Sequence, residues 1–209
     1  MNNYIPWVEK YRPKVLDDLI LEDSLRKRFE RFVEKKSFPN LLFHGKAGAG
    51  KTTVAKILVD STGCDLLEID GSKNGSVETL RSEIDPFVRS LSLFGNRKCV
   101  LIDESDYLTP KTQPALRKLL EDFYDNCSFI LTCNYPDKII EPLHSRCSVI
   151  DFTIGRNSRV KLRNELFERV ENILEIEGVS YDEKEIQSLV KKYFPDYRKV
   201  LQELYSLYG

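Results

Sequence analysis

The sequence carries no strong excess of charge of either sign. Its 209 residues include 32 Lys and Arg against 33 Asp and Glu, which leaves a formal net charge of −1. Proteins that coat nucleic acid through bulk charge are basic, so this balance excludes that mode of binding. Any contact with DNA or RNA therefore needs positive charge gathered on one face.

Long apolar runs are missing as well. No stretch approaches the roughly 18 apolar residues that a membrane-spanning helix needs. Residues 1–7 show no basic segment leading into an apolar one, so we expect no signal peptide. The cysteines are odd in number and none has CxxC spacing; they are Cys64, Cys99, Cys127, Cys133 and Cys147. We therefore expect reduced thiols in a cytoplasmic protein with no membrane partner.

Apolar runs of strand length do alternate with helical patterns from residue 40 onward. Strands are predicted at 40–44, 65–69, 98–103, 129–134 and 149–152, and helices at 23–36, 51–61, 76–92 and 111–124. Near-continuous apolar strands are typical of burial on both faces, and their alternation with helices is typical of parallel sheets. The predicted fold class is α/β, with a parallel five-stranded sheet covered by helices on both faces.

The pattern changes at residues 153–158. Helices are predicted at 158–177, 182–192 and 196–208, with no further strand. We therefore place an α/β domain at 1–154 and a small all-helical domain at 155–209. Because about 55 residues bury little surface alone, the second domain is expected to pack on the first.

Residues 45–52 read GKAGAGKT and fit the pattern GxxxxGK[ST] without a mismatch. A predicted strand precedes the segment and a predicted helix follows it, which is the context that a phosphate-binding loop requires. Glycines let the backbone fold around an anion, and the helix N-terminus faces it. Lys51 would contact the β- and γ-phosphates, and the Thr52 hydroxyl would bind Mg²⁺. A Gly-rich turn that fits by chance is the alternative.

Two acids, Asp103 and Glu104, follow the apolar run at 99–102. Parallel α/β sheets bind ligands at the carboxyl ends of their strands. One carboxylate, Asp103, suffices to hold Mg²⁺ together with Thr52 and phosphate oxygens, and Glu104 can then polarise an attacking water. Turn or capping residues are the alternative, and Asp106 is interpreted as a helix-entry or ion-pair residue.

Three further side chains are candidates for the phosphate site because of their positions at the ends of predicted strands and helices. Asn134 ends the next strand, where it could orient the water or contact the γ-phosphate, or serve only as a turn residue. Arg146 precedes the last strand and cannot easily reach its own phosphate loop, although it could reach a neighbouring subunit's. Arg198 lies in the first turn of the last helix, where the helix dipole does not favour a cation, which hints at a contact with nucleotide.

Together with the Tyr11-Arg12-Pro13 and Ser145-Arg146-Cys147 motifs, these residues resemble AAA+ ATPases. More narrowly they resemble the small subunits of sliding-clamp loaders, of the replication factor C type and closest to the T-even phage clamp loader ATPase subunit. The similar stretches are 7–13, 16–20, 45–53, 100–106, 133–134, 145–147 and 194–198, which span nearly the whole chain.

The resemblance implies the cofactors ATP and Mg²⁺, with the metal held by Thr52 and Asp103. It implies Glu104 as the catalytic base and Arg146 as an arginine finger acting in trans. Lys51, Asn134 and Arg198 would complete the catalytic set. The implied nucleotide-binding residues are Val8, Glu9, Tyr11, Arg12, Ile20, Gly45, Gly48, Ala49, Gly50, Lys51, Thr52 and Thr53.

The implied function is that of a DNA-dependent ATPase in a clamp loader. Its partners would be other copies of itself and a further loader subunit in a ring, the sliding clamp, and primer–template DNA. Lys73, Arg81 and Lys111 are the candidates to contact DNA phosphates, although residues of this kind are more often ordinary surface charges. The compartment would be the host cytoplasm for a phage protein and the nucleus for a eukaryotic one.

The chain departs from the loader pattern in several places. Loader small subunits usually carry a further helical collar of about a hundred residues, and this chain ends where the collar would begin. We therefore expect either a fragment, or an assembly that is weak or uses another partner. Gly75 stands where relatives carry a basic residue, and Pro114 lies in the helix expected to couple Gln113 and Arg117 to DNA. Proline should delay or kink that helix unless it is the first residue. A non-catalytic nucleotide-binding scaffold and another AAA+ DNA motor, of initiator or branch-migration type, remain as alternatives.

Overall fold

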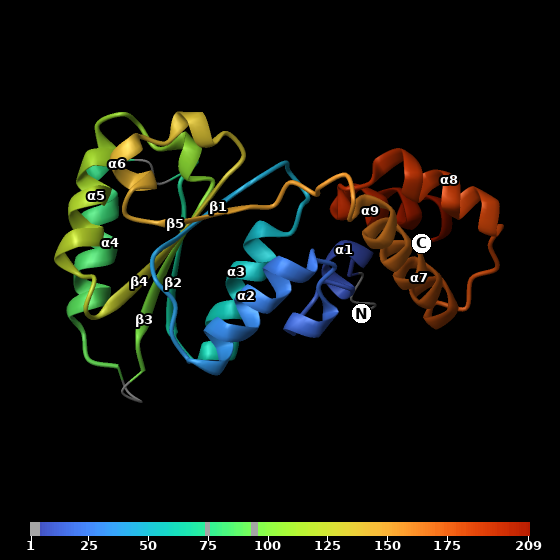
Figure 1. Cartoon of the computed structure of the whole chain (residues 1–209), viewed down its shortest axis with the longest axis horizontal. Helices are drawn as coiled ribbons and strands as arrows, with labels where there is room; N and C mark the ends of the chain where they lie inside the picture. Colours follow the sequence, from blue (N-terminus) through green and yellow to red (C-terminus); the bar gives the residue numbers. More distant parts are fainter. Residues whose placement is uncertain (1–4, 74–75, 93–95) are drawn as a thin grey trace.

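The computed structural model describes residues 5–73, 76–92 and 96–209. A five-stranded sheet forms the centre of one part of the molecule, and helices form the other part (Figure 1). The strands are β1 (Leu41–His44), β2 (Asp65–Asp70), β3 (Lys98–Asp103), β4 (Cys127–Cys133) and β5 (Ser148–Asp151). Their order in the sheet is β2-β3-β4-β1-β5, and every neighbouring pair is parallel. The predicted α/β class with a parallel five-stranded sheet is confirmed.

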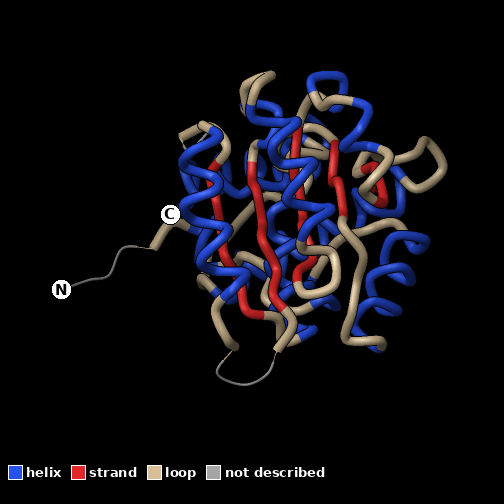
Figure 2. The backbone as a smooth tube through the Cα atoms, turned by 90° about the vertical axis from the view of Figure 1, so that its left-hand side faces the viewer, coloured by secondary structure: helices blue, strands red, loops and turns tan. Residues whose placement is uncertain are grey.

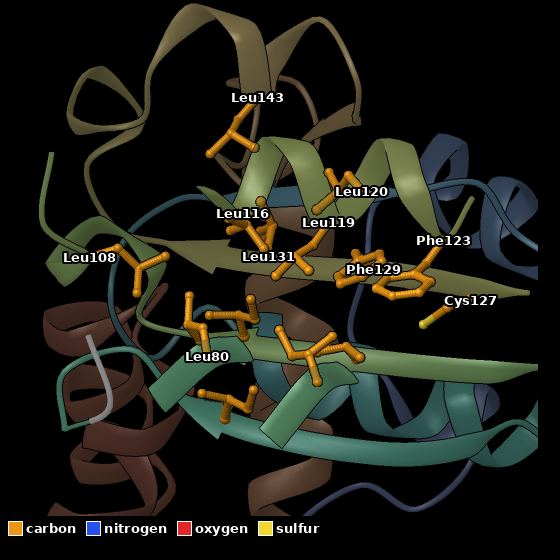
Figure 3. Packing of buried hydrophobic residues seen from close by; sticks show 14 of the residues in the cluster. Leu80, Leu108, Leu116, Leu119, Leu120, Phe123, Cys127, Phe129, Leu131 and Leu143 are labelled. Carbon is orange, nitrogen blue, oxygen red and sulfur yellow. The ribbon is translucent and has the colours of Figure 1, made fainter. Parts of the chain in front are cut away.

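Successive strand residues point to opposite faces of the sheet, which builds two separate cores. Val100 and Ile102 pack on one face with α4 (Val77–Arg89), α5 (Thr112–Asp122) and α6 (Glu141–His144). Figure 3 shows this cluster, in which Leu80, Leu116 and Phe129 are among the labelled side chains. Cys99 and Leu101 pack on the other face with α2 (Asp23–Glu34) and α3 (Lys51–Thr62). Figure 2 shows the strands enclosed between helices.

A third cluster belongs to the helices after the sheet. These are α7 (Arg159–Ile176), α8 (Glu183–Tyr193) and α9 (Tyr197–Tyr208). The short helix α1 (Trp7–Lys10) joins them: Trp7 is buried and lies edge-on to the ring of Tyr205, with 5.6 Å between ring centroids. The N-terminal segment therefore packs on the helices at the other end of the chain, as Figure 1 shows.

Three short 3₁₀ turns complete the described elements: η1 (Leu16–Asp18), η2 (Ser105–Tyr107) and η3 (Pro136–Lys138). Among the described residues, none of the helices is long and apolar enough to cross a lipid bilayer. All five cysteines are free thiols.

The expectation that Pro114 would delay or kink its helix is wrong. The helix begins at Thr112, so Pro114 occupies its third position without being its first residue. The first four N–H groups of a helix have no intrahelical partner, and a proline among them therefore removes no hydrogen bond.

Candidate functional site

The loop between β1 and α3 has the backbone of an anion cradle. Gly48 and Gly50 have φ angles of +74° and +88°, which side chains with a Cβ rarely adopt. Helix α3 starts at Lys51, and its N-cap Gly50 provides no side-chain acceptor. The first N–H groups of α3 therefore stay available, and the positive end of the helix faces the loop.

The ammonium group of Lys51 is buried inside this loop. Its Nζ donates to the carbonyl oxygens of Gly45 at 2.8 Å and Lys46 at 3.0 Å, and to Asn134 Oδ1 at 2.9 Å. Burial lowers the pKa of Lys51 from its ordinary value, against the attraction of nearby acids. Lys51, which the sequence placed in the phosphate loop, and Asn134, which it placed at a strand end, are thus in direct contact.

The end of β3 brings a carboxylate to the start of α3. Asp103 Oδ1 accepts a hydrogen bond from Thr52 Oγ1 at 2.8 Å. Glu104 follows in the left-handed region at φ +54°, and its side chain is exposed. Two hard oxygens side by side suit Mg²⁺, which prefers oxygen ligands and keeps several waters.

Backbone from the neighbouring strand fixes this turn. Gly71, directly after β2, donates its N–H to the carbonyl of Asp103 at 2.8 Å. A Cβ on Gly71 would lie 2.8 Å from the carbonyl oxygen of Glu104, closer than van der Waals contact allows. The approach therefore requires glycine.

These groups line one pocket between the sheet and the helical cluster. Predicted residues found in its lining are Val8, Tyr11, Arg12, Ile20, Gly48, Ala49, Gly50, Lys51, Thr52, Thr53, Asp103, Glu104, Asn134 and Arg198. The lining combines the phosphate loop and its polar neighbours with aliphatic side chains from the N-terminal segment, α7 and α9. The residue types fit a nucleoside triphosphate with its metal: an apolar wall for a base, a cradle for phosphates and two hard oxygens for Mg²⁺.

The start of α9 closes over the phosphate loop. A Cβ on Gly48 would lie 1.9 Å from Asp196 Oδ1, so the helix packs directly on this glycine. Asp196 also caps α9 by accepting from the N–H of Lys199 at 2.9 Å. The cap places Arg198 at the pocket, beside the loop.

Other predicted residues lie elsewhere. Glu9 is outside the pocket lining and pairs with Arg12 at 2.5 Å, while Gly45 contributes through its carbonyl oxygen. Arg146 is also outside the lining; its guanidinium binds Glu121 and donates to the carbonyl of Pro142 at 3.0 Å.

The three residues predicted to contact DNA are all exposed, and all lie outside the pocket lining: Lys73, Arg81 and Lys111. Lys73 pairs with Asp70 at 3.0 Å. Gly75, where the sequence departs from the loader pattern, lies outside the described residues.

Sequence reasoning missed Thr132, Arg169 and Tyr197, which also line the pocket. Arg169 donates to the carbonyl of Asp18, and Tyr197 donates to the carbonyl of Ile20 at 3.2 Å. Tyr197 lies in the stretch 194–198 that resembles the loader family, but no motif marks Arg169. The contacts of both residues depend on how the helical cluster meets the N-terminal segment. The hydroxyl of Thr132, which directly follows the apolar run Phe129-Ile130-Leu131, was a signal that the sequence offered.

The fold and the loop define a P-loop nucleotide-binding protein of the doubly wound α/β type with a helical lid. The chain belongs to the AAA family, described as ATPases associated with various cellular activities, whose profile matches residues 41–154. A second profile, that of the AAA+ ATPase lid domain of the sliding-clamp-loader large subunit, matches residues 158–208.

Several curated relatives are replication factor C small subunits. The chain is 36% identical to that of Methanothermobacter thermautotrophicus over 206 residues, covering 96% of this chain and 62% of the relative. The corresponding figures are 37% identity, 95% and 63% for a Methanococcus maripaludis protein, and 35%, 98% and 64% for the Archaeoglobus fulgidus protein. The chain thus spans somewhat less than two thirds of the length of these relatives.

Among solved structures, the fold is similar to RuvB of Thermotoga maritima, described as a Holliday junction branch migration motor. The TM-score is 0.73 at 20% identity, with 94% of this chain and 64% of that chain covered. Another structure of RuvB from the same organism, that of a mutant, gives a TM-score of 0.74 at 18% identity. It covers 94% of this chain and 65% of that chain. At this identity the likeness establishes the fold alone.

Proposed function

We propose that the chain is the ATPase part of a sliding-clamp loader subunit, which binds ATP and Mg²⁺ and hydrolyses ATP at interfaces between subunits. The observation that carries the proposal is a pocket that unites Lys51, Asp103, Glu104 and Asn134 while Arg146 lies outside it. The similarity to replication factor C small subunits and the match to a clamp-loader lid support the loader assignment.

Each residue has a role that follows from its place in the pocket. The loop and the N-terminus of α3 bind the phosphates, and Lys51 exchanges its carbonyl contacts for phosphate oxygens. Thr52 and Asp103 would hold Mg²⁺, which neutralises charge on the phosphates. Exposed Glu104 accepts the proton of the attacking water. Asn134 orients that water, and Arg198 contacts phosphate from the lid.

Arg146 is proposed to complete the site of a neighbouring copy. Its guanidinium is held by Glu121, by the carbonyl of Pro142 and by Ser145 Oγ, so it is ordered but exposed at the protein surface. A planar fork of this kind binds phosphate with two bonds. A site shared between copies makes hydrolysis depend on assembly.

The wider partners follow from the same proposal. The ring would contain other copies of the chain and a further loader subunit, and would act on the sliding clamp and primer–template DNA. Lys73, Arg81 and Lys111 are proposed to meet DNA phosphates, so binding would tolerate sequence and weaken with salt. The proposed compartment is the cytoplasm, or the nucleus for a eukaryotic protein.

The deciding experiment is ATP turnover against protein concentration with primer–template DNA, for wild type and Arg146→Ala. Specific activity should rise with concentration, and Arg146→Ala should lower it by about 10³-fold or more. Arg89→Ala is the matched control, because Arg89 lies exposed in the last turn of α4 over the ring of Phe123.

Mixing two inactive variants tests the shared site directly. Lys51→Ala keeps Arg146 but loses the phosphate contact, and Arg146→Ala keeps an intact loop. A mixture should regain turnover, because loops of one variant then meet arginines of the other. Turnover per chain that is independent of protein concentration and is unchanged in Arg146→Ala would contradict the proposal of an active site shared between subunits.

A further inference from the structure

Thr132 occupies a position that the proposed roles leave unexplained. It is the penultimate residue of β4, its side chain is 2% exposed, and it lines the nucleotide pocket. Its neighbours Leu131 and Cys133 are buried too. A hydroxyl in such a strand costs free energy unless it finds hydrogen-bond partners.

The partners of this hydroxyl are both acids of the site. Thr132 Oγ1 donates to Asp103 Oδ1 and accepts from the backbone N–H of Glu104 at 3.1 Å. A hydroxyl has a single proton, and an N–H can only donate. The direction of both bonds is therefore fixed, and the hydroxyl links the carboxylate of one acid to the backbone of the next.

Thr132 also holds the residue that follows these acids. Its carbonyl oxygen accepts from Ser105 Oγ at 2.7 Å. Glu104, which lies between Asp103 and Ser105, has the left-handed φ of +54°, a conformation that is unfavourable for a residue with a Cβ. Three hydrogen bonds from one strand residue thus maintain the turn that presents Asp103 and Glu104.

Asp103 Oδ1 therefore has two hydroxyl donors, Thr52 and Thr132. Thr52 is at the start of α3 and faces the phosphate loop, whereas Thr132 approaches from β4. Together they fix the rotation of the carboxylate about its Cα–Cβ and Cβ–Cγ bonds. Groups that orient a ligating carboxylate contribute to metal affinity without touching the metal.

We propose that Thr132 is a positioning residue for the divalent cation, which it serves by orienting the carboxylate of Asp103 and holding the backbone of Glu104. The inference rests on the proposed function, since it takes Asp103 as the metal ligand. Thr132 acts through these two residues, so its hydroxyl should affect Mg²⁺ and not metal-free nucleotide binding.

The test compares Thr132→Val, which keeps the shape and loses the hydroxyl, with Thr132→Ser, which keeps the hydroxyl. The affinity for a fluorescent ATP analogue is measured in EDTA and across a Mg²⁺ titration, without turnover. Thr132→Val should raise the Mg²⁺ concentration for half-maximal effect by about 10–100-fold. It should leave the affinity in EDTA unchanged, and Thr132→Ser should behave as wild type.

Ser128→Ala is the matched control on the same strand. Ser128 Oγ donates to the carbonyl of Phe38 at 2.8 Å, away from the pocket, so its loss should lower stability and leave the Mg²⁺ response intact. Thr132→Ala serves as a second hydroxyl-free variant, and thermal unfolding shows which variants are folded.

The experiment distinguishes a failure of the positioning role of Thr132 from a failure of the proposed function. A folded Thr132→Val with a wild-type Mg²⁺ titration, or with weakened binding in EDTA as well, would overturn the positioning role and leave the proposed function standing. A wild-type protein that binds the analogue with no response to Mg²⁺ would contradict the metal assignment in the proposed function, and the inference would fall with it.

Discussion

At the scale of single residues, the contact of Gly71 with the Asp103–Glu104 turn leaves no room for a side chain. The atoms that a Cβ would meet belong to the backbone of Asp103 and Glu104, which cannot move aside as the end of a flexible side chain can. We expect Gly71→Ala to lower the free energy of unfolding by about 1–3 kcal/mol, measured by urea denaturation. Gly155→Ala is the control, because its Cβ would meet only the carboxylate end of Glu22, at 3.2 Å; a cost as large there would contradict the explanation.

A second residue-scale prediction concerns acid. The Ser72 hydroxyl and backbone N–H and the Lys73 ammonium group hold the pKa of Asp70 at about 2, below its ordinary value of 3.8. The folded state therefore favours the ionised carboxylate, and this stabilisation is complete above pH 3.8 and lost as the pH falls towards 2. The difference in unfolding free energy between wild type and Asp70→Asn should shrink over that interval. A difference that stays constant from pH 5 to pH 2 would refute it.

Residue types at the site were predictable where a motif fixes their spacing. The GKAGAGKT segment placed Lys51 and Thr52 at phosphates because such a loop must follow a strand and precede a helix. The hydrogen bond from Lys51 to Asn134 was not predictable, since it depends on how β4 approaches the loop in space. Asp106 was expected as a helix-entry or ion-pair residue; it is buried, and its Oδ2 accepts the N–H groups of Asn134 and Tyr135.

At the scale of elements, helix α4 ends on a buried ammonium group. Lys98, at the start of β3, donates to the carbonyls of Phe87 and Ser90 and to Ser90 Oγ. It supplies a donor where the last carbonyls of a helix have none, in a helix whose Pro86 already lacks an N–H. Lys98→Met should lower the free energy of unfolding by about 1–3 kcal/mol.

Lys56→Met provides the comparison for that measurement. Lys56 pairs with Glu68 at 2.8 Å across the protein surface, and both side chains are about two-fifths exposed. Exposed ion pairs contribute about 0–1 kcal/mol. If both variants lose the same free energy of unfolding in the same denaturant series, the hydrogen bonds of Lys98 to the end of α4 stabilise the protein no more than an exposed ion pair does.

The element pattern was the part of the fold that the sequence predicted best. Apolar strands such as residues 99–102 have a partner on each face, so their hydrophobicity alone indicated a sheet covered on both sides. Element ends were less predictable: the helix expected at 76–92 ends at Arg89, where a tertiary contact from Lys98 caps it. Such a cap is invisible to local patterns.

At the scale of the whole molecule, the single tryptophan directly precedes a residue of the nucleotide pocket. Trp7 is buried against the helical cluster, and the next residue, Val8, lines the pocket. Adding ATP should therefore produce a saturable change in Trp7 fluorescence, which Lys51→Ala should abolish. Unchanged emission at an ATP concentration that saturates binding by calorimetry would contradict this coupling.

The division of the chain at residues 154 and 155 remains a prediction. Strand β5 ends at Asp151 and α7 begins at Arg159, while Trp7 packs with the helices of the second part. The sequence could not predict this packing of Trp7, because no local pattern in residues 5–13 indicates a contact with residues so distant in the chain.

The packing of α1 on α9 also sets an order of events during protein synthesis. Tyr205, against which Trp7 lies, is added to the chain about 200 residues after it. At a translation rate of about 5–20 residues per second, Tyr205 is synthesised on the order of 10–40 s after α1. The five strands are complete at Asp151, so the sheet can form while the ribosome is still making the helices. Because residues of α9 line the nucleotide pocket, the pocket is completed after the sheet, once α9 has emerged.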